Sequence, residues 1–270
     1  MDVRHYQEDV AAWRQMLDDS LRQENGWLAL AGLFWLREGD NAFGSDPTNP
    51  VVLPDEAAAQ LGVFRLTADA MTLHTTLEAD VRINGDIVRE AVLLPDSSGM
   101  PTRVTIGQVS MIVIQREALY AIRMWDNARS QRHTFPGRQW YPLQPNYCLT
   151  ATFTAFDNAQ PMTMNRSLGA DFEQQAIGSV TFTLNGEEHR LLVFVEADGR
   201  LFLPFRDKTS GKETFGSGRY FKTDIPQNNT ITLDFNRAYH PPCFFTPYAT
   251  CTLPPRQNWL PIAIEAGERI

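Results

Sequence analysis

The chain has 270 residues, 43% hydrophobic and 21% charged, a composition that fits an ordinary globular protein of one large domain or two small ones. Its formal net charge of −8 argues against nucleic acid as a partner, because sequence-independent binding depends on neutralising phosphates. The longest apolar run, ten residues from Trp27 to Leu36, is shorter than the roughly 20 that span a bilayer, so no membrane partner is expected.

The N-terminal sequence and the cysteine content indicate the compartment. The opening residues, MDVRHYQEDV, are charged and lack the apolar core of a signal peptide, which predicts a cytoplasmic protein. A reducing cytoplasm would keep Cys148, Cys243 and Cys251 as thiols, and three cysteines make no disulfide framework.

Residues 1–25 are predicted to form an N-terminal amphipathic helix. Apolar residues recur there at steps of three and four, at Val3, Tyr6, Val10, Trp13, Leu17 and Leu21. Asn25 and Gly26 follow this stripe and are a suitable stop signal for a helix.

Residues 26–125 are predicted to form an antiparallel β-sandwich. Short segments rich in Val, Ile, Thr and Phe are separated by turn signals, of which Asn84-Gly85 is a strong hairpin signal. The order of FGSDPTNPVVLPD, VRINGDIV and IGQVSMIVI resembles a forkhead-associated domain. The resemblance implies that fold but not phosphothreonine binding, because Ser45 stands where the family has its Arg and EAAAQLG replaces the Ser and His.

Residues 126–270 are predicted to form a second antiparallel sheet or barrel. The polar stretch DNARSQRHTFPGRQWYPLQPN marks the boundary, and Asn185-Gly186 and Asp198-Gly199 supply further turns. Five prolines between Asp234 and Trp259 exclude a helix or a central strand, so this segment is expected to be an ordered loop that closes the subdomain. The whole chain is therefore expected to be mainly β.

Four segments in order resemble a bacterial and archaeal family known only as domain of unknown function 1684. They are GLFWLREGDNAFGSDPTN, FRDKTSGKETFGSGRYF, DFNRAYHPPCFFTPYATCTLPP and NWLPIAIEAGE. The resemblance implies no activity. It departs at His240, where the family pattern has Asn, and this weighs against any mechanism that needs an imidazole at this position.

The proline-rich loop carries residues that suit a metal or a nucleophile. His240, Cys243 and Cys251 would be acceptable zinc ligands, but structural zinc sites normally show paired cysteine knuckles and a fourth ligand. We expect no metal and no cofactor, with the cysteines as buried apolar groups or, alternatively, a Cys243–Cys251 disulfide. A Cys243 nucleophile would need a base from elsewhere, with His133 and His189 the candidates by elimination, so enzymatic activity stays open.

Arginines suggest a site for an anion. Arg129, Arg132 and Arg138 fall close together in an acidic chain, and Arg219 follows the glycine-rich FGSG. Arginine offers a rigid fork for carboxylate or phosphate, and glycine-rich turns present backbone N–H groups to anions. The alternative is that these arginines solvate the linker and pair with acids such as Asp126, Asp207 and Asp234.

Polar residues entering the proline-rich loop complete the candidate site. On a regular strand, Asp234 and Asn236 would share one face, and Tyr239 follows them. The first hypothesis is a binding or catalytic pocket in residues 126–270 for a small anionic molecule. It would be formed by Arg129, Arg132, Arg138, Arg219, Asp234, Asn236, Tyr239 and Cys243. The alternative is a protein–protein interaction module with a structural C-terminal loop. It requires an exposed apolar or edge-strand patch in the first half.

Overall fold

Helix α1 (Val3–Arg22) confirms the predicted amphipathic helix. The computed structural model describes residues 3–68, 70–196 and 198–270. Tyr6, Val10 and Leu21 on the apolar stripe are buried. The helix ends as expected, because Asn25 adopts a left-handed φ of 59° and the Leu28 N–H donates back to the Leu21 carbonyl at 3.3 Å.

Internal contacts divide the chain into two compact units, which are described separately. Unit 1 comprises Met1–Asp19 and Pro136–Ile270, and unit 2 comprises Ser20–Phe135. No helix in the described ranges is long and apolar enough to cross a membrane. The chain is mainly β with one long helix, as the sequence predicts.

Unit 2 contains two sheets that share one apolar core. The first sheet has the order β1 (Leu30–Trp35), β11 (Leu119–Asp126), β10 (Val109–Arg116), β9 (Val104–Ile106), β6 (Arg82–Ile83) and β7 (Asp86–Ile87). The second has the order β3 (Val51–Val52), β2 (Gly39–Gly44), β4 (Gly62–Leu66), β5 (Met71–Thr75) and β8 (Glu90–Val92). Short helical turns lie at η1 (Asp96–Ser98) and α2 (Gln131–Thr134).

The core of unit 2 explains why these strands pack as two layers. Phe43 and Phe64 of the second sheet and Met111 and Ile122 of the first are buried in one cluster. The predicted Asn84-Gly85 turn joins β6 to β7 with both residues at positive φ, as a two-residue hairpin of this type requires.

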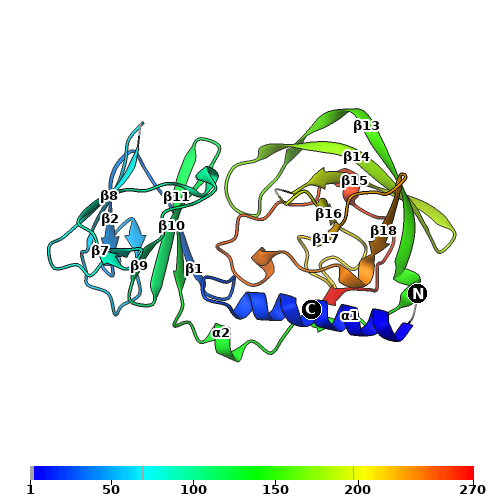
Figure 1. The fold of residues 1–270 in the computed structure, drawn as a ribbon, viewed down its shortest axis with the longest axis horizontal. Helices are drawn as coiled ribbons and strands as arrows, with labels where there is room; N and C mark the ends of the chain where they lie inside the picture. The colour runs from blue at the N-terminus through cyan, green and yellow to red at the C-terminus, as the bar shows by residue number, and fades with distance from the viewer. Residues whose placement is uncertain (1–2, 69, 197) are drawn as a thin grey trace. The chain divides into compact units, whose positions relative to one another are not determined.

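Unit 1 is built on one curled sheet of six antiparallel strands (Figure 1). Its order is β17 (Arg219–Thr223), β16 (Leu201–Phe205), β15 (Glu187–Val195), β14 (Phe172–Leu184), β13 (Cys148–Met164) and β18 (Thr230–Asp234). The sheet curls until its two edge strands meet, and the Thr223 hydroxyl of β17 donates to the Thr232 carbonyl of β18 at 3.1 Å. A small second sheet pairs β12 (Gln139–Trp140) with β19 (Glu268–Arg269), and a short turn, η2 (Pro145–Tyr147), precedes β13.

The proline-rich segment closes this half-barrel, as predicted. It contains three 3₁₀ turns, η3 (Phe235–Arg237), η4 (Pro242–Phe244) and η5 (Arg256–Asn258). The Phe235 ring inserts among Phe182, Phe205 and Phe221, with centroid separations of 5.4, 5.5 and 6.0 Å. Asn258, fully buried, bonds to both backbone groups of Leu192 and to the Pro204 carbonyl, and so bridges β15 and β16.

Two glycines with similar backbone angles test how tightly this region is packed. A Cβ at Gly218 (φ 93°) would lie 2.4 Å from the Phe205 carbonyl oxygen, whereas at Gly211 (φ 83°) the nearest atom is 3.9 Å away. Gly211→Ala should destabilise unit 1 by about 1–2 kcal/mol through backbone strain alone. Gly218→Ala should lower the free energy of unfolding by at least twice as much in urea titrations. Equal losses would show that the close approach at Gly218 is relieved without strain.

Candidate functional site

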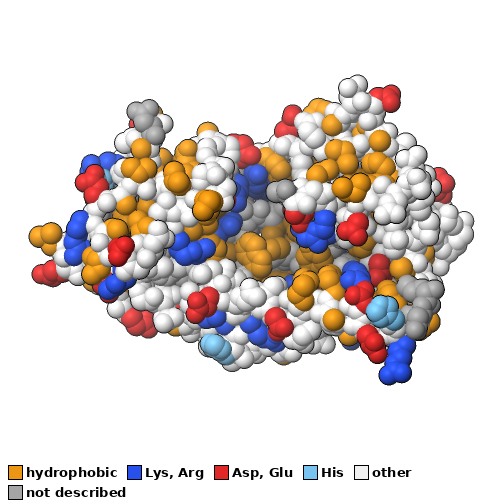
Figure 2. Space-filling view, in the orientation of Figure 1, with side chains coloured by type: hydrophobic (Ala, Val, Ile, Leu, Met, Phe, Trp, Pro, Cys, Tyr) orange, Lys and Arg blue, Asp and Glu red, His pale blue; other side chains and the backbone are white. Residues whose placement is uncertain are grey.

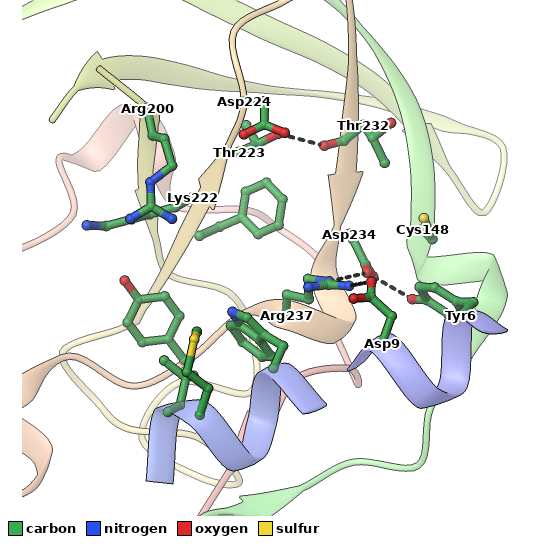
Figure 3. Close-up of a pocket in the computed structure, with 15 residues that line it drawn as sticks. Tyr6, Asp9, Cys148, Arg200, Lys222, Thr223, Asp224, Thr232, Asp234 and Arg237 are labelled. Carbon is green, nitrogen blue, oxygen red and sulfur yellow. Dashed lines mark hydrogen bonds and ion pairs between the residues drawn. The ribbon is translucent and has the colours of Figure 1, made fainter. Parts of the chain in front are cut away.

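One cavity of unit 1 lies beside helix α1, where the edge strands of the curled sheet meet (Figure 3). Its volume is about 570 Å³. The lining residues come from α1, the start of β13, β17, β18 and the segments beside them: Tyr6, Asp9, Trp13, Met16, Leu17, Cys148, Arg200, Phe221, Lys222, Thr223, Asp224, Thr232, Asp234, Arg237 and Tyr239.

Helix α1 forms one wall of the cavity because its apolar stripe faces the sheet. Tyr6, Trp13 and Leu17 belong to that stripe, and Asp9 and Met16 flank it. The Trp13 ring contacts Tyr239 of the proline-rich segment edge to face, with centroids 6.3 Å apart. Rings therefore line much of the cavity.

A buried polar cluster closes one end of the cavity. The Tyr6 hydroxyl donates to Asp234 Oδ1 at 2.8 Å and accepts from Asn236 Nδ2 at 3.0 Å. Asp234 Oδ1 also accepts from the Asn236 backbone N–H at 3.1 Å, and its Oδ2 lies 3.2 Å from Arg237 Nε. Arg237 forms a second ion pair with Asp9. The cluster thus ties the helix to the end of β18.

The ionisable groups at this end favour their neutral or paired forms. Burial, followed by the hydrogen bond to Asp234, raises the pKa of the Tyr6 phenol above its ordinary range. Burial and then the Asp234 charge raise the pKa of the Cys148 thiol. A thiol in this environment resists ionisation and is a poor nucleophile.

Two cations stand at the other end of the cavity (Figure 3). Arg200 pairs with Asp198 through Nε and Nη2 at 2.8 and 2.6 Å, and Lys222 Nζ lies 3.4 Å from Glu196. The Arg200 side chain is 52% exposed and that of Lys222 is 25% exposed. Figure 2 shows basic and acidic side chains next to one another on this face of unit 1. The Arg200–Asp198 pair is exposed and contributes little stability, whereas the Lys222–Glu196 pair is partly buried.

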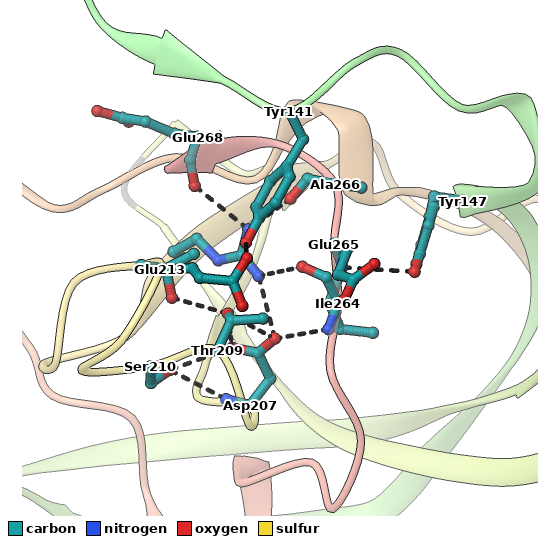
Figure 4. A network of polar contacts seen from close by, with 12 residues as sticks. Tyr141, Tyr147, Asp207, Thr209, Ser210, Glu213, Ile264, Glu265, Ala266 and Glu268 are labelled. Atoms are coloured by element: carbon teal, nitrogen blue, oxygen red, sulfur yellow. Dashed lines mark hydrogen bonds and ion pairs between the residues drawn. The ribbon is translucent and has the colours of Figure 1, made fainter. Parts of the chain in front are cut away.

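Arg219 points inward, and its partners are internal. Its side chain is fully buried, and Nη2 lies 3.3 Å from Asp207 Oδ2. The guanidinium also donates to the carbonyls of Ala266, Ile264 and Glu268 at 2.5, 2.8 and 3.3 Å. Asp207 is held in turn by Thr209, Ser210 and the Ile264 N–H (Figure 4). In this structure Arg219 offers no donor to a ligand in the cavity.

The glycine-rich turn before Arg219 is likewise used internally. The N–H groups of Gly211, Lys212 and Gly218 donate to backbone carbonyls of the same turn at 2.8–3.0 Å. The Phe215 N–H donates to His240 Nε2 at 3.2 Å. These donors fix the turn and do not face an anion.

The other predicted arginines also have internal partners. Arg138 is buried, with Nη1 2.5 Å from Glu268 Oε2 and its guanidinium over the Phe245 ring. Arg129 and Arg132 belong to unit 2, where they donate to the backbone carbonyls of Leu30, Asn127 and Arg22. None of the four predicted arginines lines the cavity.

The remaining predicted residues divide between the cavity and its surroundings. Asp234 and Tyr239 line it, and Asn236 supports it from behind. Asn236 is not on a regular strand, because the chain turns into η3 after Asp234; the Asp234 side chain caps that turn. Cys243 is elsewhere in the segment, where its N–H donates to Cys251 Sγ at 3.2 Å.

Several cavity residues are missed by sequence reasoning. The helical stripe indicates only a core position for Tyr6 and Trp13, and no motif singles out Asp9, Arg200 or Lys222. The Tyr6 hydroxyl on an otherwise apolar stripe is the one available signal, because a buried phenol needs a hydrogen-bond partner. Nothing in the sequence indicates that this partner is Asp234.

His240 is a buried structural residue and does not reach the cavity. Its Nε2 accepts from Phe215 N–H, which leaves the proton on Nδ1, 3.2 Å from Glu268 Oε1. Glu268 Oε2 also accepts from the His240 backbone N–H at 2.6 Å. The Nε2 lone pair is therefore engaged and Nδ1 carries the proton, so the imidazole has no free lone pair for base catalysis. In the described ranges, no group of three or more His, Cys, Asp and Glu side chains is placed to hold a metal ion.

His240 should make stability depend on pH. Burial lowers the pKa of His240 in the folded state, and the charges of Arg219 and Arg138 act in the same direction against Glu268. The unfolded chain therefore binds a proton first as the pH falls below about 6.5, and stability decreases from there until the folded imidazole is protonated. In His240→Asn, the free energy of unfolding should fall less steeply between pH 7 and pH 5. Parallel curves for the two proteins would contradict this assignment.

Comparisons with known proteins assign the second half of the chain to a family. Residues 133–269 match the family described as protein of unknown function (DUF1684). A solution NMR structure of an uncharacterised protein from Haloarcula marismortui is 33% identical, with 52% of this chain and 80% of that chain covered and a TM-score of 0.44. No curated protein matches the chain. The forkhead-associated resemblance of unit 2 stays a prediction.

Proposed function

This chain belongs to DUF1684, a family of unknown function, and we propose that the cavity of unit 1 binds a small organic anion. The observation that carries the proposal is the distribution of groups around the cavity. Rings line its walls, Arg200 and Lys222 stand at one end, and the buried Tyr6–Asp234 cluster closes the other.

Size and lining favour a small-molecule ligand. A volume of about 570 Å³ lies within the range of roughly 300–1,000 Å³ common for ligand pockets, which combine apolar walls with a few polar groups. Trp13, Phe221 and Tyr239 would contact the body of the ligand. A planar or aromatic body fits best, because such rings stack and pack edge to face.

The charges favour an acidic group at the Arg200 end. Arg237 is neutralised by Asp234 and Asp9, so it has little attraction left for a ligand anion. Arg200 and Lys222 each have one carboxylate partner. The Arg200–Asp198 pair is exposed, so a ligand carboxylate or phosphate would displace Asp198 at small cost. The proposal keeps the anionic ligand expected from the sequence but assigns its binding to Arg200 and Lys222.

The proposal is binding, without a chemical step. Cys148 is the one thiol among the described lining residues, and its environment opposes ionisation. No histidine occurs in that lining. We keep the cytoplasm as the expected compartment.

A thermal-shift screen of aromatic carboxylates and phosphates tests the proposal. A ligand at ten times its Kd should stabilise the protein by about 1.4 kcal/mol. Arg200→Ala and Lys222→Ala should each weaken binding about tenfold, the equivalent of one charge-assisted hydrogen bond. Lys212→Ala, an exposed lysine outside the cavity, is the matched control and should bind as the parent does. Equal weakening in all three variants would indicate a general charge effect and remove the site.

An interaction surface on unit 2 is a second candidate. Strand β8 is an edge strand of its sheet. Val92, in this strand, is 63% exposed, and Leu94, just after it, is 50% exposed. Both border an apolar hollow of about 180 Å³, whose lining includes Leu66, Met71 and Tyr120. An extended peptide with alternating apolar residues would add to this edge. If such a peptide binds to this surface, Val92→Lys should abolish its co-purification with the protein. Unchanged co-purification would exclude strand β8 as the binding surface.

A further inference from the structure

Two cysteines of the proline-rich segment lie in direct contact. The Cys243 N–H donates to Cys251 Sγ at 3.2 Å, so the Cys251 sulfur lies against the backbone of Cys243. Cys251 is 6% exposed, whereas Cys243 is half-buried and reachable from solvent. Neither residue lines the cavity of unit 1, so the chemistry of this pair is independent of the proposed function.

The backbone around the pair is fixed by several hydrogen bonds. Ser167, in the connection between β13 and β14, accepts from the Cys251 N–H through Oγ at 2.9 Å and donates from its own N–H to the Cys251 carbonyl at 2.8 Å. The same Oγ donates to the Ala249 carbonyl at 2.7 Å. Cys243 lies in the η4 turn, whose end is stabilised by the Phe245 and Thr246 N–H groups donating to the Pro242 carbonyl. The segment therefore presents the two thiols to each other in the folded state.

We propose that Cys243 and Cys251 form a reversible redox pair that reacts with small disulfides. The Cys243 thiolate attacks one sulfur of the disulfide, forming a mixed disulfide and releasing the first thiolate. Cys251, after losing its proton, attacks the Cys243 sulfur and releases the second thiolate. The two protein thiols lose two electrons and two protons, and the small disulfide is reduced to two thiols.

The environments of the two sulfurs assign these roles. A hydrogen bond from the Cys251 thiol lowers the pKa of Cys243, and the exposure of Cys243 allows a small disulfide to reach it. The Cys243 thiolate and burial together raise the pKa of Cys251. An accessible, more acidic thiol beside a buried one is the arrangement of an attacking and a resolving cysteine.

Peptide mapping of the full chain after incubation with oxidised glutathione tests the pair. The parent protein should give a Cys243–Cys251 crosslinked peptide, which dithiothreitol converts back to two thiols. Cys148→Ser is the control and should give the same crosslink. In Cys251→Ser the mixed disulfide should persist on Cys243, and in Cys243→Ser the folded protein should show no adduct at Cys251.

Two results would overturn the proposal. One is a parent protein in which Cys243 and Cys251 stay free thiols while glutathione adds to Cys148. The other is a glutathione adduct that persists on Cys243 in the parent without resolving to the crosslink. If Cys251→Ser fails to fold, the peptide map of the parent protein still tests the proposal, because that experiment requires no substitution.

Discussion

Replacing Arg219 by methionine should lower the free energy of unfolding of unit 1 by about 3–5 kcal/mol, the usual effect of removing one partner of a buried ion pair. Methionine replaces the aliphatic part of the arginine side chain but not its charge. The buried Asp207, which is 8% exposed, is then left without its cation. The carbonyls of Ala266, Ile264 and Glu268 lose donors in the same change. Since Ile264, Ala266 and Glu268 belong to the C-terminal segment, that segment should loosen first.

Urea unfolding followed by tryptophan fluorescence measures this loss. Arg200→Met removes an exposed, paired arginine from the same unit and should change stability by less than about 1 kcal/mol. Arg219→Lys keeps the charge but cannot form the same fork, so it should also destabilise the fold, equally with and without added carboxylates or phosphates. A loss at Arg219 that an added anion restores would return this residue to the ligand site.

Asp234→Ala should cost about 2–4 kcal/mol, because it leaves several buried donors without an acceptor. The Tyr6 hydroxyl and the Asn236 N–H lose their bonds to Oδ1, and Arg237 loses one of its two carboxylates. Because Tyr6 is on helix α1 and Asp234 ends β18, the helix loses a tie to the sheet. Binding to the cavity should weaken together with stability.

Asp224→Ala is the matched control for this change. Asp224 also lines the cavity, but it is exposed, and its substitution should change stability by no more than about 0.5 kcal/mol. Chemical denaturation of the two variants side by side gives the comparison. Similar small losses in both would mean that the Tyr6–Asp234 cluster does not hold the helix in place.

Local sequence signals predicted the elements well because their causes are local. A stripe at steps of three and four specifies helix α1 whatever it packs against. Asn84-Gly85 and Asn185-Gly186 both form the tight hairpin turns expected of them, since these residues accept positive φ readily. Prolines excluded regular structure from the segment that closes the half-barrel.

Partners of the polar residues were not predictable in the same way. FGSGR made Arg219 a candidate for the anion site, but its acceptors Asp207 and Ala266 lie on either side of it in sequence and meet it only in the folded unit. Tyr6 and Asp234 are separated by 228 positions, and no local pattern links them. The alternative stated from the sequence, that the arginines pair with acids, describes Arg138 and Arg219. No sequence signal indicated that Arg200 and Lys222 line the cavity.

The most direct test of the cavity as a ligand site is chemical-shift mapping on ¹⁵N-labelled protein titrated with the tightest anion from the thermal screen. A ligand in the cavity should give saturable shifts of amide signals on the cavity side of α1, on β17 and β18 and around Arg200. The Trp13 indole signal should move with the same Kd. Shifts confined to unit 2, or to the Arg219 turn while Trp13 stays unchanged, would contradict a ligand site in this cavity.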